Sequence, residues 1–428
     1  MALALTLVLA GIQLSQASAR ADDAPYAPGE VLVQYEGEFG ERQVELPEGV
    51  SVPEAVRSLR QRPDVAYANP NYLVRAADAC GRPTDPGSGG VDCWRADQWN
   101  FLATAAGIDA PGAWANLRQA GHGGGAGVTV AVLDTGVAYR SRGARFRRDP
   151  DLPPTKRFVD PKDFVDGDNV PLDKDGHGTH VTSTIVQATN NGLGLTGLAY
   201  RAKVMPVRVL DETEHGTAAD VARGIRYAAK HGADVINLSL EFGPGVDICG
   251  KIRGVCRALR RATSHGVTIV AAAGNSSRAR VAYPAAWRNA IAVGATTDSS
   301  CLASYSSYGK RLDLVAPGGG WDAPAATGNP LCGQSTGRKV EQYSLDPAAA
   351  AAGNFHSFGL VGRSGTSMAA AHVSGAAALL RARGTPPGSI AGRLQCTATE
   401  LGIVGRDDFY GAGLLNAARA TDPSFSCP

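Results

Sequence analysis

The sequence lacks the features that mark several large classes of protein. Residues 2–14 are apolar, but no stretch reaches the ~20 apolar residues that span a bilayer. The net charge is only +2 over 428 residues, so we expect neither a nucleic acid nor a membrane surface as a partner. The eight cysteines do not have zinc-finger spacing, and no His-Glu-x-x-His occurs. What is left is a globular protein, for which 44% hydrophobic and 19% charged residues are ordinary values.

Apolar runs alternate with amphipathic segments over most of the chain. We expect strands at residues 128–133, 203–210, 235–240, 268–272 and 290–294, and helices at residues 218–231, 252–265 and 373–383. This alternation predicts an α/β fold, with a mostly parallel sheet and helices on both faces. Residues 318–362 have little periodicity and much glycine, proline and alanine, so we expect a long surface insertion or mobile loop there.

The beginning of the chain has a different pattern. Ala17-Ser18-Ala19 follows the apolar run and has the small residues of a cleavage site. Residues 1–19 are therefore predicted to be a secretory signal peptide, although no Lys or Arg precedes the run. Residues 25–77 contain a strand-like, a helical and an extended segment, which predicts a small α+β unit. A Gly/Pro-rich linker at residues 78–94 follows this unit.

The cysteines are even in number and accompany a predicted secretion signal, which favours four disulfides. The sequence does not determine their connectivity. Pairing between cysteines that are neighbours in the sequence would give Cys80–Cys93, Cys249–Cys256, Cys301–Cys332 and Cys396–Cys427.

Three short segments place reactive side chains where a strand ends or a helix begins. Ser367 lies among small residues just before an apolar run that is typical of a buried helix. The helix N-terminus would place N–H groups and a positive dipole end where an oxyanion forms. Asp134 ends a buried strand, and His177 lies between two glycines ahead of an apolar segment. A serine becomes a nucleophile when a base takes its proton and a third group orients that base.

In these three motifs, and in their order Asp, His, Ser, residues 95–420 resemble the subtilisin-like serine proteases, or subtilases. The resemblance implies that Asp134 orients the imidazole, that His177 is the general base and acid, and that Ser367 is the nucleophile. Ala271–Ser276 resembles the family segment that carries the oxyanion asparagine, which would be Asn275.

The same resemblance implies how the chain is organised. Residues 95–428 would be the catalytic domain, and residues 25–77 resemble the inhibitory prodomain of the family. We therefore expect a secreted serine endopeptidase that is made as a self-processed precursor and acts on polypeptides as a monomer. Its own prodomain would be an intramolecular inhibitor.

Substrate-binding residues follow from the resemblance as well. The substrate would lie as an added strand between two protein segments, which the resemblance places at Gly216 and at Ser239, Leu240 and Glu241. Ala282 would lie at the floor of the P1 pocket, where a methyl group replaces the usual glycine. This predicts a preference for medium apolar or aromatic P1 side chains.

Four carboxylates stand where the family usually has glycine or small neutral residues, and these are Asp211, Glu212, Glu214 and Glu241. They would favour basic substrate side chains at P2–P4. The alternative is a solvated loop face with no role in specificity.

Two loops offer the oxygen ligands that Ca²⁺ prefers. Asp163, Asp166 and Asp168 resemble a metal loop of some thermostable subtilases, and Asn191 with Asp151 resembles the loop around the strong calcium of the family. Structural Ca²⁺ is therefore expected, with a polar surface loop as the alternative at each place.

Two other functions compete with this reading. Asp134-Thr135-Gly136 matches the loop of aspartic proteases, but those enzymes need two such carboxylates, and no second Asp-Thr-Gly or Asp-Ser-Gly occurs. An inactive subtilase scaffold would display a cleft without chemistry. All four catalytic positions are filled, which favours an active enzyme.

Overall fold

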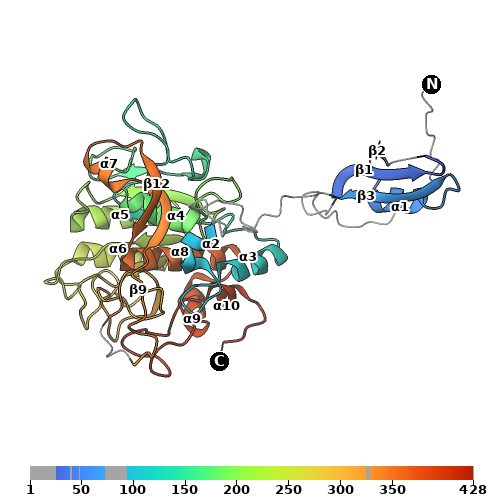
Figure 1. The fold of residues 1–428 in the computed structure, drawn as a ribbon. Helices are drawn as coiled ribbons and strands as arrows, with labels where there is room; N and C mark the ends of the chain where they lie inside the picture. The colour runs from blue at the N-terminus through green and yellow to red at the C-terminus, as the bar shows by residue number, and fades with distance from the viewer. Residues whose placement is uncertain (1–25, 39–40, 48, 73–93, 324–327, 428) are drawn as a thin grey trace. The chain divides into compact units, whose positions relative to one another are not determined.

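The computed structural model describes residues 26–38, 41–47, 49–72, 94–323 and 328–427. The chain forms two compact units, Met1–Asp78 and Ala79–Pro428, each of which is described by itself (Figure 1). The predicted signal peptide, most of the predicted linker, and Cys80 and Cys93 lie outside the described residues.

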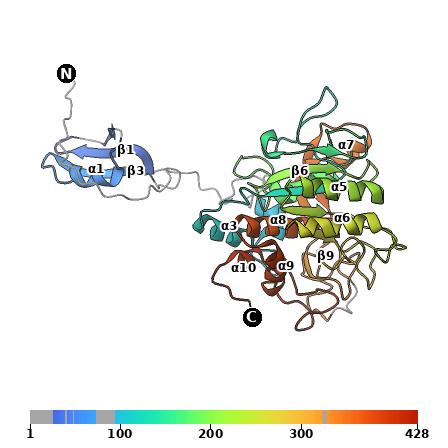
Figure 2. The same cartoon turned by 180° about the vertical axis from the view of Figure 1, so that it is seen from behind.

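The first unit is a three-stranded antiparallel sheet with one helix (Figure 2). Its elements are β1 (Tyr26–Tyr35), β2 (Arg42–Glu45), α1 (Val52–Leu59) and β3 (Val65–Tyr72), and the strand order is β2-β1-β3. The helix buries Val52, Ala55, Val56 and Leu59 against Val31 and Val33 of β1. Apolar residues at i, i+3, i+4 and i+7 thus cover one face of the sheet, as expected of a helix with one apolar stripe. The predicted α+β character of this unit is confirmed.

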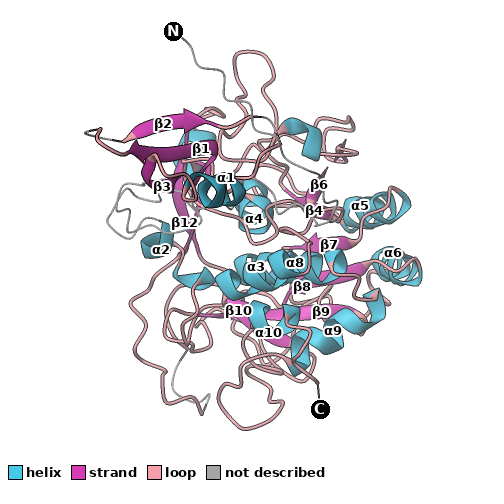
Figure 3. Cartoon of the chain, turned by 90° about the vertical axis from the view of Figure 1, so that its right-hand side faces the viewer, coloured by secondary structure: helices cyan, strands magenta, loops and turns pink. Residues whose placement is uncertain are grey.

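The second unit is built on a seven-stranded sheet with strand order β10-β9-β8-β7-β4-β6-β5, all parallel (Figure 3). The strands are β4 (Thr129–Asp134), β5 (Lys162–Asp163), β6 (Lys203–Arg208), β7 (Val235–Leu238), β8 (Thr268–Ala272), β9 (Ala290–Thr296) and β10 (Leu314–Pro317). The predicted α/β fold with a mostly parallel sheet is confirmed.

Helices cover both faces of this sheet. They are α2 (Trp94–Asp97), α3 (Ala110–Gln119), α4 (His177–Val186), α5 (Ala218–Lys230), α6 (Arg253–Ser264), α8 (Thr366–Ala382), α9 (Pro387–Cys396) and α10 (Ala417–Thr421). Alternate residues of one strand serve the two faces. In β4, Val130 and Val132 pack with α4 and α8, while Ala131 and Leu133 pack with α5 and α6. Because helices cover both faces of the sheet, its strands are apolar at nearly every position and not only at alternate ones.

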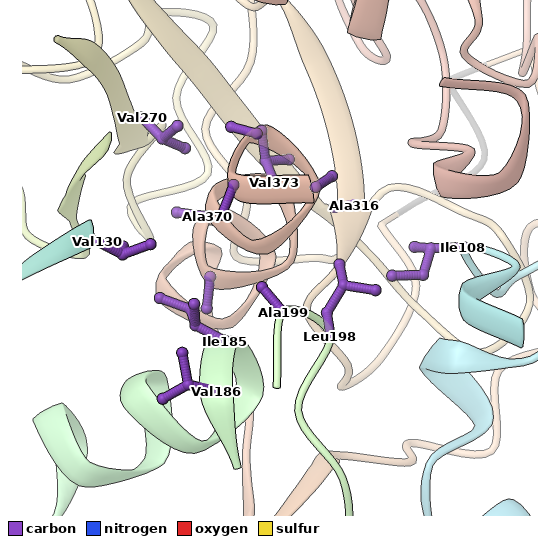
Figure 4. Close-up of a cluster of buried hydrophobic side chains, with 14 of the residues drawn as sticks. Ile108, Val130, Ile185, Val186, Leu198, Ala199, Val270, Ala316, Ala370 and Val373 are labelled. Carbon is purple, nitrogen blue, oxygen red and sulfur yellow. The ribbon is translucent and has the colours of Figure 1, made fainter. Parts of the chain in front are cut away.

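Helix α8 lies at the centre of the larger core (Figure 4). Its residues 366–380 are all buried, and Ala370 and Val373 lie among Val130, Ile185 and Val270. Small residues allow this close approach. A Cβ at Gly375, for example, would lie 3.0 Å from the Leu198 side chain.

Residues 318–362 are not simply a long irregular loop. They contain β11 (Val340–Leu345), α7 (Pro347–Ala351) and most of β12 (Phe358–Arg363), and the two strands pair antiparallel. This hairpin packs on α4, where Val340 and Leu345 are fully buried and the His180 Nε2–H lies 3.0 Å from the carbonyls of both Val340 and Val361. Residues 340–343 alternate between buried and partly exposed positions, and residues 344 and 345 are both buried. The buried positions include Gln342 and Ser344, so the sequence does not show the apolar alternation of a strand.

Three predicted disulfides are present, joining Cys249 to Cys256, Cys301 to Cys332 and Cys396 to Cys427. Over the part of the chain that the structure describes, no helix combines the length and the apolarity needed to cross a membrane.

Candidate active site

The site lies where β4 ends and where α4 and α8 begin. Asp134 is the last residue of β4, His177 is the first of α4, and Ser367 is the second of α8. His177, Ser367 and Asn275 line one cleft of about 710 Å³. Four segments that are distant in the sequence thus meet at the carboxyl edge of the sheet, which is where ligands bind in such folds.

Asp134 and His177 form a buried pair. The carboxylate Oδ1 lies 2.7 Å from His177 Nδ1 and also accepts the Thr135 N–H at 2.8 Å. Asp134 is fully buried, and His177 is 8% exposed. Burial alone would lower the pKa of His177, but the charge and the hydrogen bond of Asp134 outweigh it, so the pKa is raised above the ordinary value. Because Nδ1 is held by the carboxylate, Nε2 is the nitrogen left for proton transfer.

Ser367 lies in the first turn of α8. Its hydroxyl donates to the Ser239 carbonyl at 3.2 Å, and the Ser239 hydroxyl donates to the Ser367 carbonyl at 2.9 Å. Among the described residues no hydrogen bond joins Ser367 to His177. Catalytic hydrogen bonds are often long without substrate and shorten when the substrate binds.

The side-chain amide of Asn275 makes hydrogen bonds through its oxygen only, within the described residues. Its Oδ1 accepts the N–H and the hydroxyl of Thr366, both at 2.9 Å. This fixes the side-chain orientation and leaves Nδ2 without an acceptor in the described part of the chain. The N–H of Ser367 also has no partner there, as expected in the first turn of a helix. The two donors border the same cleft as the Ser367 hydroxyl.

Comparison with known proteins identifies the family. The model of the Subtilase family matches residues 125–413. The chain belongs to the subtilase family. Thermitase of Thermoactinomyces vulgaris is 35% identical, over 73% of this chain and 93% of its own length. Subtilisin Savinase of Lederbergia lenta is 37% identical, over 69% of this chain and 91% of its own. The protein is therefore a subtilisin-like serine peptidase, a hydrolase of peptide bonds.

A solved structure of a Pseudoalteromonas arctica PAMC 21717 protease superposes with a TM-score of 0.62. It is 29% identical and covers 79% of this chain and 98% of the other. The family assignment made from the three motifs is confirmed, and so is the fold that it implies.

The segments predicted to hold substrate flank the cleft of this subtilase. Gly216 borders it on one side, and Ser239, Leu240 and Glu241 on the other. The backbone groups of Gly216 and Leu240 make no hydrogen bond within the described residues, so both are free to pair with an added strand. Ala282 lines a small hollow that adjoins the cleft and shares Glu241 with it.

Three of the four acidic residues predicted to rim the cleft have partners within the protein. Glu212 pairs with buried Arg208 at 3.1 Å, and Glu214 pairs with Arg363 at 2.9 Å. Asp211 accepts the N–H and the hydroxyl of Thr213 in a tight turn. The two arginines offset the charge of Glu212 and Glu214, and the turn directs the Asp211 carboxylate toward Thr213. Glu241 differs from them because its carboxylate accepts the N–H of Asn275, inside the cleft.

Asp173 is a site residue whose role the sequence did not reveal. Its buried carboxylate accepts the Thr135 hydroxyl at 3.0 Å, the Thr179 hydroxyl at 2.5 Å and the Gly176 N–H at 2.9 Å. It therefore ties the turn after β4 to the start of α4, and so holds the two ends that carry Asp134 and His177. In the sequence, only the position of Asp173 within the histidine motif indicated such a role. A carboxylate at the start of a helix usually indicates no more than a helix cap.

Calcium fits one of the two predicted loops. Asp151 is buried and accepts the Asn191 side-chain amide at 2.7 Å. Nearby Asp149 is also buried, and its Oδ2 has no hydrogen-bond partner. An unpaired carboxylate oxygen beside a second buried carboxylate and an amide is the donor set that a hard cation takes.

The loop at Asp163, Asp166 and Asp168 does not fit a calcium site. Arg208 is fully buried and lies 3.1 Å from Asp163 and 2.8 Å from Asp166. Asp166 also pairs with Lys174, and Asp168 lies 3.7 Å from Arg142. Protein cations thus occupy the place that a metal would take. Among the described residues, no cluster of three or more His, Cys, Asp or Glu side chains has metal-site geometry.

Proposed function

We propose that this subtilase is an endopeptidase in which Asp134, His177, Ser367 and Asn275 carry out acyl transfer. The observation that carries the proposal is the 2.7 Å contact from Asp134 to His177 at the edge of a cleft that also holds Ser367 at a helix N-terminus. Each of the parts that such chemistry needs is present in one place.

The reaction would begin when His177 Nε2 takes the Ser367 proton and Oγ attacks the substrate carbonyl. Asn275 Nδ2 and the Ser367 N–H would hold the oxyanion that forms. His177 then gives the proton to the leaving amine, which leaves an acyl-enzyme on Ser367. Water, deprotonated by the same imidazole, releases the acid and restores the serine. Asp134 keeps the imidazole in the required tautomer throughout.

Labelling with a serine-directed fluorophosphonate tests this assignment. The wild-type protein should react at Ser367, while Ser367→Ala and His177→Ala should not. Labelling at another serine, or equal labelling of the alanine variants, would contradict the proposal.

We also infer that the chain is a secreted, self-processed precursor. Residues 26–72 have their own core, which supports a separate inhibitory unit corresponding to the predicted prodomain at residues 25–77. The short apolar run and Ala17-Ser18-Ala19 support a signal peptide. A structural Ca²⁺ held by Asp151 and Asn191, with Asp149 beside them, would stabilise the loop between β4 and α4.

A further inference from the structure

Glu241 directs its carboxylate at the inner wall of the cleft. Oε1 accepts the backbone N–H of Asn275 at 2.9 Å. A Cβ built on Gly274 would meet Glu241 Oε2 at 2.5 Å and the Ala282 methyl at 3.1 Å. Oε2 and the Ala282 methyl therefore face the same point. A side chain at position 274 would therefore collide with the carboxylate, and the φ of +108° at Gly274 also favours glycine.

The second oxygen of the Glu241 carboxylate is available as a hydrogen-bond acceptor. Over the described residues, Oε2 accepts no hydrogen bond and Glu241 forms no ion pair. Arg363, a cation on the cleft wall, is held by Asp175 and Glu214. Other cations line the cleft or the adjoining hollow, namely Lys339, Arg278 and Arg280. None of them pairs with Glu241. A free carboxylate oxygen in a substrate cleft is a site for a donor that the substrate brings.

The position of the oxyanion donors shows which substrate residue this is. If the proposed function holds, the reacting carbonyl lies between Asn275 and Ser367. The side chain of the same residue, P1, then enters the space between segments 239–241 and 272–275, which both border the cleft. We propose that Glu241 is the acidic determinant of the P1 pocket and selects substrates with Arg or Lys at P1. This replaces the apolar P1 preference expected from Ala282 alone.

Physical chemistry supports a basic P1 side chain over other choices. The Glu241 side chain is exposed without substrate, where an ion pair contributes little. A bound substrate would exclude water from the space between segments 239–241 and 272–275. A guanidinium or ammonium group there would form a charge-assisted hydrogen bond with Oε2. Arg and Lys carry their charge at the end of a long flexible side chain, which suits a carboxylate on the wall of the cleft.

The test is a set of peptides that differ only at P1, carrying Arg, Lys, Gln, Met or Ala. We expect kcat/KM for Arg or Lys to exceed that for Gln or Met by at least about tenfold. Glu241→Gln keeps an acceptor for the Asn275 N–H but removes the charge, so it should lower the ratio of the Arg and Lys rates to the Met and Ala rates by about tenfold. Glu212→Gln is the matched control, because Glu212 pairs with Arg208 and does not line the cleft. It should leave the P1 ratios as they are.

Two results would overturn the proposal. One is an Arg-to-Met ratio that Glu241→Gln does not change. The other is a wild-type enzyme that prefers Ala at P1 and a Glu241→Gly variant that also accepts all large P1 side chains. That pair of results would mean that the Glu241 carboxylate fills the P1 pocket and does not bind a basic side chain. Fluorophosphonate labelling of Ser367 in the same preparations separates this failure from failure of the proposed function. Labelled enzyme without a basic P1 preference contradicts only the role of Glu241.

Discussion

At the scale of single residues, the environment decides what each ionisable group can do. His177 and His372 are both buried histidines, yet their pKa values shift in opposite directions. His177 has the carboxylate of Asp134 beside it, which favours the charged form. His372 has only neutral partners, the Met368 carbonyl and the Asn100 amide, so burial favours the neutral form.

Removing the side-chain oxyanion donor should reduce turnover and leave substrate binding nearly intact. Asn275→Ala is expected to lower kcat by about 10²–10³-fold with little change in KM, because Nδ2 would meet the oxyanion only after attack. Steady-state kinetics on one peptide measure both parameters. A rise in KM at unchanged kcat would assign Asn275 to ground-state binding instead.

His372 should make the protein less stable in acid. Burial lowers its pKa to about 4, while an unfolded histidine titrates near 6.5. Between these values the unfolded chain binds the proton more readily, so the free energy of unfolding decreases as the pH falls from about 6.5 to about 4. Two and a half pKa units correspond to about 3 kcal/mol.

His372→Gln removes this titration and keeps a donor for Met368 and an acceptor for Asn100. Chemical denaturation at several pH values, in a Ser367→Ala background that prevents autolysis, should give a flatter pH dependence for this variant. An unchanged slope would show that His372 is not the group responsible.

At the scale of elements, α8 and α4 bring the reacting groups together. α8 runs through the core and has Ser367 in its first turn at the cleft, and the β11–β12 hairpin covers α4. The loop between β4 and α4 contains both acidic segments considered for calcium. In one of them Arg208 supplies the positive charge, and in the other a buried carboxylate oxygen has no partner. Only the second loop should respond to metal.

Chelation should therefore lower the melting temperature without directly stopping the chemistry, since a bound ion stabilises by mass action. Asp151→Asn should abolish the difference between calcium and chelator in a calorimetric scan. Asp168→Asn, in the other loop, should retain it. A chelator effect that survives Asp151→Asn but not Asp168→Asn would reverse our assignment of the two loops.

At the scale of the whole molecule, the two units have separate cores and the proposed chemistry would act on the chain itself. Ser367→Ala should leave the full-length precursor uncut, because the enzyme that would remove residues 25–77 is the one disabled. Expression of the variant without other proteases, followed by mass spectrometry, measures this. Wild-type protein made in parallel should yield a fragment that begins after the first unit. Normal maturation of Ser367→Ala would contradict self-processing.

The sequence by itself determined the family and the α/β class, and it predicted the four residues of the proposed catalytic site. These depend on local signals, such as an apolar strand that ends in Asp134, another that ends shortly before Asn275, and a serine at the start of a buried helix. Among the described residues, the six cysteines also pair with their neighbours in the sequence, because the shorter a loop is, the less entropy its closure costs.

Only the tertiary structure decided which charges are free to act. Arg208 is more than forty residues from Asp163 and Asp166 in the sequence, and it meets them only because β5 pairs with β6. In the same way, the Glu241 carboxylate accepts a hydrogen bond from Asn275, which follows the neighbouring strand. Glu212 and Glu214 instead form ion pairs with arginines. A charge acts through distance and burial, which a linear pattern does not contain. Which of the two predicted loops fits a cation, and which subsite Glu241 is proposed to face, therefore became apparent only once the chain was folded.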